Sequence, residues 1–446
     1  MSADDLAYAA EPLLAEMKKS REKYDQMTRD PDEFRRDKSD VPYANDQANI
    51  RLAITRLGHR LQHNTFADRL LIDGRFLDDP AMVRLWLSID EQFGFRPGKD
   101  LFWSVTEDEA RQHPFHPVRD YLDSLEWDRE PRIETWLIRL AGAPDTPFVR
   151  AVSKLVLIAA VRRVRQPGCK FDEMMVLESS QGLNKSNALS ILAVEPEWFS
   201  DDLPLDADTK RQIEALNGRL IVEASELQGM RQGDVEHLKA FLSRQVDRAR
   251  LAYARRETEA PRQCVVIGTT NSAAYLKDAT GNRRFWPVKI GKFDLEALKD
   301  ERDQLWAEAV CYEKIETSIR LNPNLYVEAA EVQAERRVED PFLVRLREVL
   351  GDRTGKMRTS VVWKYLDIPS GQQTQNHSCR IGEAMRELGW ERIKLRFGAG
   401  RDVPPSWCYA KGTTEERSRI IEFNDLLFPH GSTRVPPVGN ERNGDS

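Results

Sequence analysis

The chain has 446 residues, of which 40% are hydrophobic and 31% are charged, and its formal net charge is −6. This length exceeds what one hydrophobic core supports and predicts two to four globular domains. The acidic balance argues against a uniformly basic nucleic-acid-binding protein, although it allows local basic clusters. The five cysteines include no CxxC pair, which argues against a zinc site or a disulfide framework and favours the cytoplasm. No signal peptide or apolar stretch of membrane-spanning length is recognisable, so no membrane partner is expected.

The N-terminal quarter of the chain predicts a charged arm and a small accessory domain. Residues 1–45 are rich in acidic and basic side chains, which favours a mobile arm or a surface helix. Ile50, Ile54 and Leu61 are spaced as on one face of a helix. We therefore expect a small helical accessory domain over residues 46–115.

Two further signals precede the middle of the chain. An Asp-Gly pair within residues 66–76 indicates a small hairpin. Apolar periodicity predicts helices over 133–140 and 147–164, which form a helical lead-in to the next segment. His116 could serve as a catalytic base, but no partner is evident, and a structural role in a turn is the favoured interpretation.

The stretch from Met174 to Ala193 has the layout of a phosphate-binding P-loop. An apolar run of strand type is followed by a small polar turn, a Lys-Ser pair and a helical pattern. Backbone N–H groups of such a turn bind phosphate oxygens, the lysine contacts the β- and γ-phosphates, and the serine hydroxyl binds Mg²⁺. The predicted nucleotide-binding residues are Ser179, Ser180, Gln181, Gly182, Leu183, Asn184, Lys185 and Ser186.

This loop departs from the full P-loop pattern at two positions. Ser179 and Asn184 stand where the pattern has glycines, and Gly182 is retained. Serine is small enough to let a phosphate approach, and asparagine tolerates a left-handed backbone better than most residues. The alternative is an ordinary strand–turn–helix connection with an exposed lysine.

Polar residues follow two further apolar runs. The run that starts at Leu220 ends with Glu223 and Glu226, and the run that starts at Cys264 ends with Asn271. After a P-loop, one carboxylate at such a strand end holds Mg²⁺ and another orients or deprotonates the attacking water. The run that starts at Cys264 ends where a residue that senses the γ-phosphate is expected. A solvated strand edge is the alternative.

Basic residues gather in two places. The segment from Lys239 to Arg256 contains the most basic stretch of the chain, which includes an aromatic residue and is compatible with contact to a nucleic-acid backbone. The alternative is a solvated, salt-bridged helix face, which is the common explanation of a run of charges. Arg283 and Arg284 lie in a turn just before an apolar strand. Arginine fingers, which reach a neighbour's γ-phosphate, need such exposure, whereas a surface salt bridge is the alternative.

The C-terminal third predicts a second folded unit. Helical patterns at 359–366 and 378–388 precede two strands, and this order is typical of a winged-helix domain. From Gly431 onwards the composition favours disorder. The basic residues that could face DNA here are Arg380, Arg386, Arg392, Lys394, Arg396 and Arg401.

Seven segments of the chain together resemble the virulence-associated protein E family of phage and mobile-element proteins. These P-loop ATPases are akin to superfamily 3 helicases and to the helicase half of phage primase-helicases. The resemblance covers roughly residues 110–320, and it rests on the order and spacing of HPVRDYLDSLEWD (116–128), LESSQGLNKS (177–186), GRLIVEASEL (218–227), LKAFLSRQVDRAR (238–250), GTTN (268–271), GNRRFWPV (281–288) and RDQLWAEAV (302–310).

The resemblance implies roles for individual residues. Glu223 would hold Mg²⁺ together with Ser186, and Glu226 would orient the hydrolytic water, although these two glutamate roles could be exchanged. Asn271 would act as the sensor. Arg283 or Arg284 would act on a neighbouring subunit in a ring, which we expect to be a hexamer. The residues that match the DNA-channel segment are Lys239, Arg244, Arg248 and Arg250.

The predicted fold class is α/β, with an AAA+-like P-loop NTPase core, a helical N-terminal region and a C-terminal winged-helix-like domain. ATP and Mg²⁺ are the expected cofactors, and DNA, most simply single-stranded, is the expected partner. A primase or another replication protein is a further candidate partner, because no primase motif precedes residue 110. The expected domains are an arm (1–45), an accessory domain (46–115), a P-loop ATPase domain with its helical lead-in (116–320), a connector (321–340), a winged-helix-like domain (341–411) and a C-terminal segment with a disordered tail (412–446).

Two functions of different classes fit these patterns. The first is an ATP-dependent DNA helicase or translocase that serves replication of a phage or integrated element. The second is a non-enzymatic replication initiator or regulator that binds DNA and has a decayed P-loop. The missing glycines and the winged-helix-like C-terminal domain favour the initiator. The groups retained for hydrolysis favour the enzyme, and they are Glu223, Glu226, Asn271 and Arg283 or Arg284.

Overall fold

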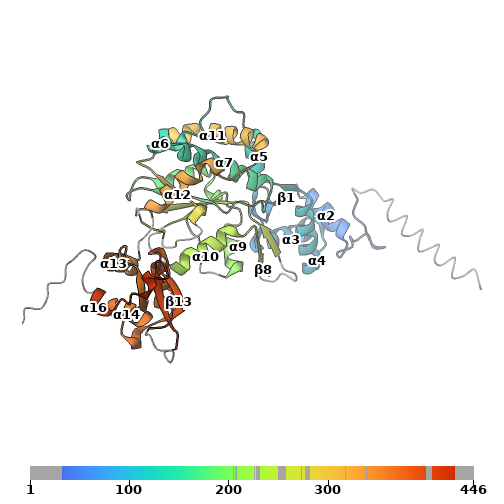
Figure 1. Ribbon diagram of the computed structural model, residues 1–446. Helices are drawn as coiled ribbons and strands as arrows, with labels where there is room; N and C mark the ends of the chain where they lie inside the picture. Colours follow the sequence, from blue (N-terminus) through green and yellow to red (C-terminus); the bar gives the residue numbers. More distant parts are fainter. Residues whose placement is uncertain are drawn as a thin grey trace, which may run out of the picture. The chain divides into compact units, whose positions relative to one another are not determined.

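The computed structural model describes residues 33–203, 205, 208–225, 227, 232–249, 258–272, 274–276, 282–316, 318–336, 340–397 and 404–426. Most of the predicted arm, the predicted disordered tail, Glu226, Arg250 and Arg401 lie outside these residues. The chain forms two compact units (Figure 1), of which the first comprises 1–229, 236–272 and 283–332, and the second comprises 230–235, 273–282 and 333–446.

The accessory region is a mixed α/β structure, so the expectation of a helical accessory domain is wrong. It contains a four-stranded sheet with the strand order β3-β2-β1-β4 and its own apolar core. Phe34, which the sequence assigned to the arm, is buried in this core. The elements are α2 (Gln47–Arg56), β1 (Leu61–Asn64), β2 (Arg69–Ile72), β3 (Arg75–Phe76), α3 (Asp79–Phe93), α4 (Lys99–Arg111) and β4 (Pro114–Phe115).

Local backbone geometry explains why the hairpin of the accessory region was predicted correctly and why its strand β1 was mistaken for part of a helix. The predicted hairpin is confirmed, because Asp73 and Gly74 have positive φ angles of 51° and 77° between the antiparallel strands β2 and β3. The helical face, however, ends at Ile54. Gly58 adopts a φ of 78° after α2, and Leu61 begins β1. Strands of four residues are too short for their alternation to be recognised against a helical pattern.

The larger part of the first unit is built on a five-stranded sheet. Its strand order is β11-β5-β10-β7-β6, and every neighbouring pair is parallel. All carboxyl ends therefore lie at the same edge of the sheet, where parallel α/β sheets place their ligand sites. The strands are β5 (Met174–Glu178), β6 (Phe199–Ser200), β7 (Ile221–Ala224), β10 (Val265–Thr270) and β11 (Phe285–Lys289).

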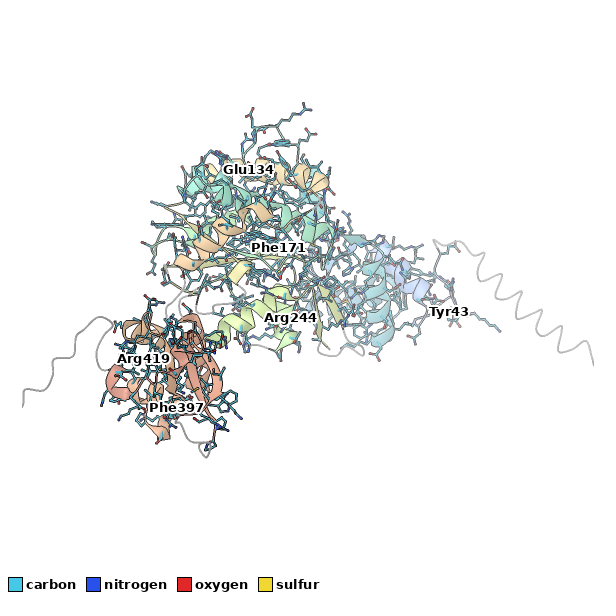
Figure 2. The ribbon with its side chains drawn as sticks, in the orientation of Figure 1. Tyr43, Glu134, Phe171, Arg244, Phe397 and Arg419 are labelled. Carbon is cyan, nitrogen blue, oxygen red and sulfur yellow. The ribbon has the colours of Figure 1, made fainter. Side chains whose placement is uncertain are left out.

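Helices cover this sheet and complete its core. The long helix α7 (Pro147–Arg165) is largely buried, and α11 (Leu295–Ile315) packs against both α7 and α8 (Lys185–Leu192). Phe171 packs edge to face on Trp286 within this core (Figure 2). A mixed α/β fold with a parallel sheet is thus confirmed. The remaining helices are α5 (Pro117–Ser124), α6 (Trp136–Ala141), α9 (Thr209–Leu216), α10 (Gln232–Ser243) and α12 (Tyr326–Glu335).

Two segments differ from their sequence-based descriptions. The region from 321 to 340, expected as a connector, contains the helix α12. The basic stretch after α10 forms the hairpin of β8 (Val246–Ala249) and β9 (Thr258–Pro261). Among the described residues, no helix is both long and apolar enough to cross a membrane.

The second unit has a separate core and a three-stranded antiparallel sheet of order β12-β14-β13. The two helices and the two C-terminal strands expected from the sequence are present, whereas β12 was not expected. The elements are α13 (Pro341–Leu350), β12 (Gly355–Arg358), α14 (Thr359–Tyr365), α15 (Gln375–Glu387), β13 (Glu391–Leu395), β14 (Ser406–Lys411) and α16 (Phe423–Leu426).

Candidate active site at the edge of the parallel sheet

The loop between β5 and α8 has the backbone shape that the sequence predicted for it. Gly182 has a φ of 82°, and Asn184 has φ and ψ angles of 66° and 24°, which is the left-handed region. Asparagine is one of the few side chains that enter this region readily, so its replacement of a glycine is compatible with the turn. Asn184 makes no side-chain cap bond to α8. The first N–H groups of that helix therefore face the loop without a side-chain acceptor.

Lys185 is held by the loop and by the neighbouring strand. Its Nζ donates to the carbonyl oxygen and the Oγ of Ser179 at 3.0 Å and 2.9 Å, and to the carbonyl oxygen of Ser180 at 3.2 Å. It also donates to Oδ1 of Asn271 at 2.9 Å, so that the predicted lysine and the predicted sensor meet directly. Burial lowers the pKa of Lys185, and the nearby carboxylate of Glu223 opposes that effect.

Glu223 is the most deeply buried acidic group of this site. It lies on β7 and is 1% exposed, and its Oε1 accepts hydrogen bonds from Ser186 Oγ at 2.9 Å and from Thr269 Oγ1 at 2.5 Å. Its Oε2 is buried and has no hydrogen-bond partner. An unpartnered buried carboxylate oxygen is costly unless another group binds it.

These residues surround one cavity of about 350 Å³. Its size is in the range of small-ligand sites. Ser179 and Ser180 contact Lys185 and do not line the cavity. The lining residues are Gln181, Gly182, Leu183, Asn184, Lys185, Ser186, Asn187, Glu223, Ser225, Thr269, Thr270 and Asn271.

Sequence reasoning missed Thr269, which contacts Glu223 directly. The available signal was its spacing, because side chains two residues apart in a strand point to the same face. Thr269 therefore shares a face with Asn271, and both lie toward the cavity. Glu226 lies outside the described residues, and Ser225, its chain neighbour, lines the cavity.

The two candidate finger arginines differ in their surroundings. Arg284 contacts Asp172 at 3.5 Å and donates from Nη2 to Ser243 Oγ at 3.2 Å, so it is engaged inside the first unit. Arg283 is exposed. Neither lines the cavity, which leaves Arg283 as the arginine accessible to another molecule.

The proposed DNA-channel residues are not equivalent. Lys239 is 8% exposed and its Nζ lies 5.9 Å from the ring centroid of Phe285, so its assignment to a DNA-facing surface is corrected. Arg244 donates to Gln212 Oε1 at 2.8 Å but remains exposed (Figure 2). Arg248 is exposed and pairs with Glu259 at 3.0 Å.

His116 makes structural contacts. Its Nδ1 accepts from the backbone N–H of Arg119 at 3.2 Å, and its Nε2 donates to Gln263 Oε1 at 2.9 Å. Burial lowers the pKa of His116, which favours this neutral form. The structural interpretation made from the sequence therefore agrees with its contacts.

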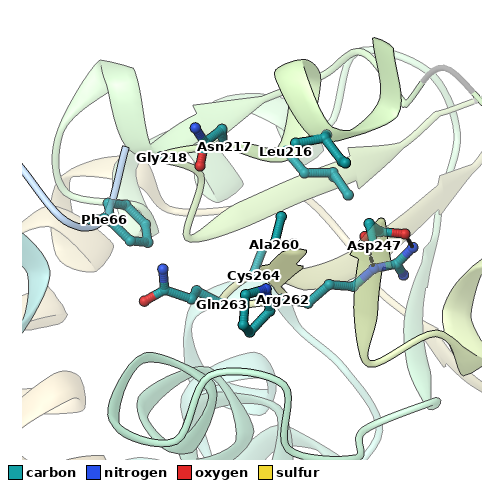
Figure 3. Close-up of a pocket in the computed structure, with 11 residues that line it drawn as sticks. Phe66, Leu216, Asn217, Gly218, Asp247, Ala260, Arg262, Gln263 and Cys264 are labelled. Atoms are coloured by element: carbon teal, nitrogen blue, oxygen red, sulfur yellow. Dashed lines mark hydrogen bonds and ion pairs between the residues drawn. The ribbon is translucent and has the colours of Figure 1, made fainter. Parts of the chain in front are cut away.

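A second, much smaller cavity lies beside Gln263 (Figure 3). Its volume is about 30 Å³, which holds water-sized molecules only. The buried pair of Arg262 and Asp247, with Nε and Oδ2 2.6 Å apart, closes one side, and Phe66 of the accessory region lines it as well. This cavity joins the accessory region to the core and contains no catalytic constellation.

Comparison with known proteins identifies the region that contains the larger cavity. The model of the virulence-associated protein E-like domain matches residues 122–338. This part of the chain is therefore similar to the virulence-associated protein E-like domain. The matched region contains the loop, Glu223, Asn271 and both finger candidates. A comparison with curated proteins finds no match.

The solved structures that match this chain include three of the NrS-1 C-terminal region. The apo structure of residues 305–718 has a TM-score of 0.45 and 12% identity, and covers 82% of this chain and 98% of that one. An A form apo structure of the same region gives a TM-score of 0.44 at 14% identity, with 82% and 99% covered. A further A form gives 0.42 at 12% identity, with the same coverage.

Proposed function

We propose that this chain is an ATP-dependent, helicase- or translocase-like ATPase that acts on DNA during replication of a phage or integrated element in the cytoplasm. The observation that carries the proposal is the convergence of Lys185, Ser186, Glu223 and Asn271 on one cavity at the carboxyl edge of a parallel sheet. These four residues come from three different strand ends. Their meeting supports an AAA+-like P-loop core.

ATP would bind with its phosphates on the loop and on the first turn of α8. The uncapped N–H groups of that turn and the positive end of the helix favour an anion. Lys185 now bonds to Ser179, Ser180 and Asn271. On binding, its Nζ would exchange carbonyl partners for phosphate oxygens and would stay close to Asn271, which can then contact the γ-phosphate.

The residues present fit Mg²⁺. A carboxylate and a hydroxyl 2.9 Å apart are the hard oxygen donors that this cation prefers, and Oε2 of Glu223 lacks any other partner. Ser186 and Glu223 would hold the ion, which neutralises charge on the phosphates when bound. Thr269 fixes the position of Oε1 of Glu223.

Hydrolysis of ATP requires two further groups, which are a residue that orients the attacking water and an arginine finger. We assign the orientation of the water to Glu226, whose chain neighbour Ser225 lines the cavity. We assign the arginine finger to Arg283, because Arg284 is engaged with Asp172 and Ser243. A finger that cannot reach its own cavity must act on a neighbouring subunit, which supports a homo-oligomeric ring, with a hexamer as the proposed state.

DNA is the proposed partner of both units. The order α13, β12, α14, α15, β13, β14 and the hairpin geometry of the last two strands support a winged-helix-like domain. In the first unit, Arg244 and Arg248 remain as candidates for backbone contact. A primase or another replication protein would supply the activity for which this chain has no recognisable motif.

The deciding experiment is the steady-state ATPase rate with and without single-stranded DNA. Wild type is compared with Lys185→Ala and Glu226→Gln. We expect hydrolysis that single-stranded DNA stimulates, and its loss in both variants, with nucleotide still bound by Glu226→Gln. Full hydrolysis by Lys185→Ala would refute the P-loop assignment.

The second candidate is a DNA-binding initiator whose loop no longer supports turnover. The specific observation in its favour is the replacement of two loop glycines by Ser179 and Asn184, with Ser179 bonded to the lysine. It predicts nucleotide binding without hydrolysis in wild type. It also predicts DNA binding that survives Lys185→Ala and is lost when residues 341–411 are deleted.

A further inference from the structure

An exposed tryptophan in the second unit, Trp407, lies beside a groove whose charged lining residues are Glu383, Arg386, Glu391 and Arg392. The groove runs between α15 and β13, and its cavity measures about 720 Å³. Arg386, Arg392 and Tyr409 are among its lining residues. Trp407 lies two residues before Tyr409 on β14, and therefore on the same face of the sheet.

Two cations near Trp407 contact its indole ring and do not form ion pairs with any carboxylate that the structure describes. The guanidinium of Arg392 lies 5.2 Å from the centroid of Trp407, and Nζ of Lys394 lies 5.1 Å from it. Lys394 is the direct cross-strand partner of Trp407, and Arg392 is that of Tyr409. Among the described residues, neither cation nor Arg386 has an ion-pair partner. All three are exposed.

Arg392 connects the tryptophan to the groove, because it belongs to both. Arg386 and Arg392 line the groove together with Tyr409, and their charges oppose the rise in pKa that burial causes at Tyr409. Trp390 lines the same groove, and its buried indole N–H has no acceptor. The surface around Trp407 thus combines exposed cations, without an ion-pair partner in the described part of the chain, and an exposed aromatic ring.

Trp407 is 51% exposed, which is unusual for a residue whose ring is among the largest apolar surfaces a protein can bury. A ring in this position can stack on an unpaired base while neighbouring cations bind the phosphates on either side. A base inside a duplex offers no free face. Recognition of duplex by α15 is also disfavoured, because Arg380 near its centre forms a two-bond ion pair with Asp340.

We propose that Trp407, Arg392, Lys394 and Arg386 form a binding site for single-stranded DNA, in which one base stacks on Trp407 and the cations hold the adjoining phosphates. The site rests on the proposed DNA partner but not on ATP hydrolysis. In this proposal, the second unit binds single-stranded DNA in preference to duplex DNA.

The test measures binding of the full-length protein without nucleotide, by fluorescence anisotropy. The probes are a labelled thymidylate single strand and a duplex of the same length. We expect wild type to prefer the single strand, and Trp407→Ala to weaken single-strand binding by about tenfold with little effect on duplex, as expected for the loss of one stack. Trp407→Phe should retain most of the affinity.

A matched control is available in the first unit. Phe76 is 55% exposed and also has a cation over its ring, because the guanidinium of Arg69 lies 5.5 Å from the ring centroid. No second cation from the described part of the chain lies over this ring. Phe76→Ala should leave both affinities unchanged. Arg392→Gln should reduce the slope of log affinity against log salt by about 0.7, whereas Trp407→Ala should leave that slope unchanged.

Three results would overturn the proposal. They are single-strand affinity within twofold of wild type in Trp407→Ala, equal losses for single strand and duplex, and a wild type that prefers duplex. The basal ATPase rate without DNA, measured on the same samples, should be the same in wild type and Trp407→Ala. Loss of single-strand binding with that rate unchanged supports the site, while absence of any hydrolysis in wild type bears on the proposed function alone.

Discussion

The cavity at the parallel sheet and the groove of the second unit hold their charges in opposite ways. In the cavity, Lys185 and Glu223 are fixed by hydrogen bonds from three strand ends, and one carboxylate oxygen is buried without a partner. Beside the groove, the side chains of Arg392 and Lys394 lie over the exposed indole of Trp407. The first arrangement suits a small anionic ligand and a cation that are held in one fixed geometry. Catalysis depends on such fixed positions of the charged groups. The second suits a flexible polyanion bound by charge and stacking, which tolerates variation.

The largest expected effect tests whether the cavity is complete within one chain. Arg283→Ala should lower the DNA-stimulated ATPase rate by about a thousandfold, the effect of removing an arginine finger. Mixing inactive Arg283→Ala with inactive Lys185→Ala subunits should restore measurable activity, because some sites then combine an intact lysine with an intact arginine.

Arg284→Ala is the control for that experiment. It removes a partner of Asp172 and Ser243, and should lower the thermal midpoint where Arg283→Ala does not. Absence of restored activity in the mixture, with both variants folded and oligomeric, would contradict a finger acting between subunits.

The next prediction tests whether the hydrogen bond that fixes Glu223 is needed for Mg²⁺ binding. Thr269→Val keeps the shape of the side chain and removes the hydrogen bond to Oε1. We expect the Mg²⁺ concentration required for half-maximal ATPase activity to rise by about tenfold, as for other partners that orient a metal-binding group. Thr269→Ser should restore the wild-type value. An unchanged Mg²⁺ requirement in Thr269→Val would mean that Ser186 alone positions the carboxylate.

A change in pH should separate the two sites. Because burial places the pKa of Lys185 below its usual value, its cation is present at low pH and is lost as the pH rises toward 10.5, earlier than for a free lysine. ATP affinity, measured with a fluorescent ATP analogue, should therefore fall as the pH is raised from 7.5 to 9.5. Single-strand binding through arginine should change little over that interval.

Lys185→Arg provides the control for the pH experiment. A guanidinium does not titrate in this range, so any residual ATP binding by this variant should be independent of pH. Loss of affinity with the same pH profile in both proteins would mean that another group is responsible.

The smallest expected effect concerns the phosphate contacts of the groove. Arg386→Gln should weaken single-strand binding by a few-fold and reduce the salt slope by about 0.7, the contribution of one phosphate contact. Arg380→Gln is the matched variant on the same helix. It should leave DNA binding unchanged and lower the thermal midpoint, because Arg380 pairs with Asp340. Equal effects of the two substitutions on DNA binding would contradict the distinction.

The sequence predicted the parts of the cavity better than their arrangement. The apolar run, the turn and the Lys-Ser pair identified β5, the loop and α8, because strand ends and helix starts are encoded by neighbouring residues. The left-handed conformation of Asn184 followed from its side chain. The contact of Thr269 with Glu223 could not be read, because it depends on the pairing of β10 with β7, whose residues are 46 positions apart.

Contacts between residues that are distant along the chain also escaped prediction in the accessory region and in the second unit. Leu61 was placed on a helix, although Gly58 ends that helix and Leu61 pairs with Ile72 in a sheet. Lys239 looked like a DNA contact within a basic run, but it is buried beside Phe285. Arg392 and Lys394 were recognised as basic residues of a hairpin, and only the strand register brought them to Trp407.

The sequence by itself determined the strand–turn–helix segment that contains Lys185, the acidic and polar strand ends, and the two helices and two C-terminal strands expected in the second unit. Each of these depends on residues that are neighbours along the chain. The tertiary structure decided which of these groups meet, which arginine remains exposed and which lysine is buried. Sheet pairing and packing bring together residues that are distant in sequence, and burial then sets the charge and hydrogen bonding of each group.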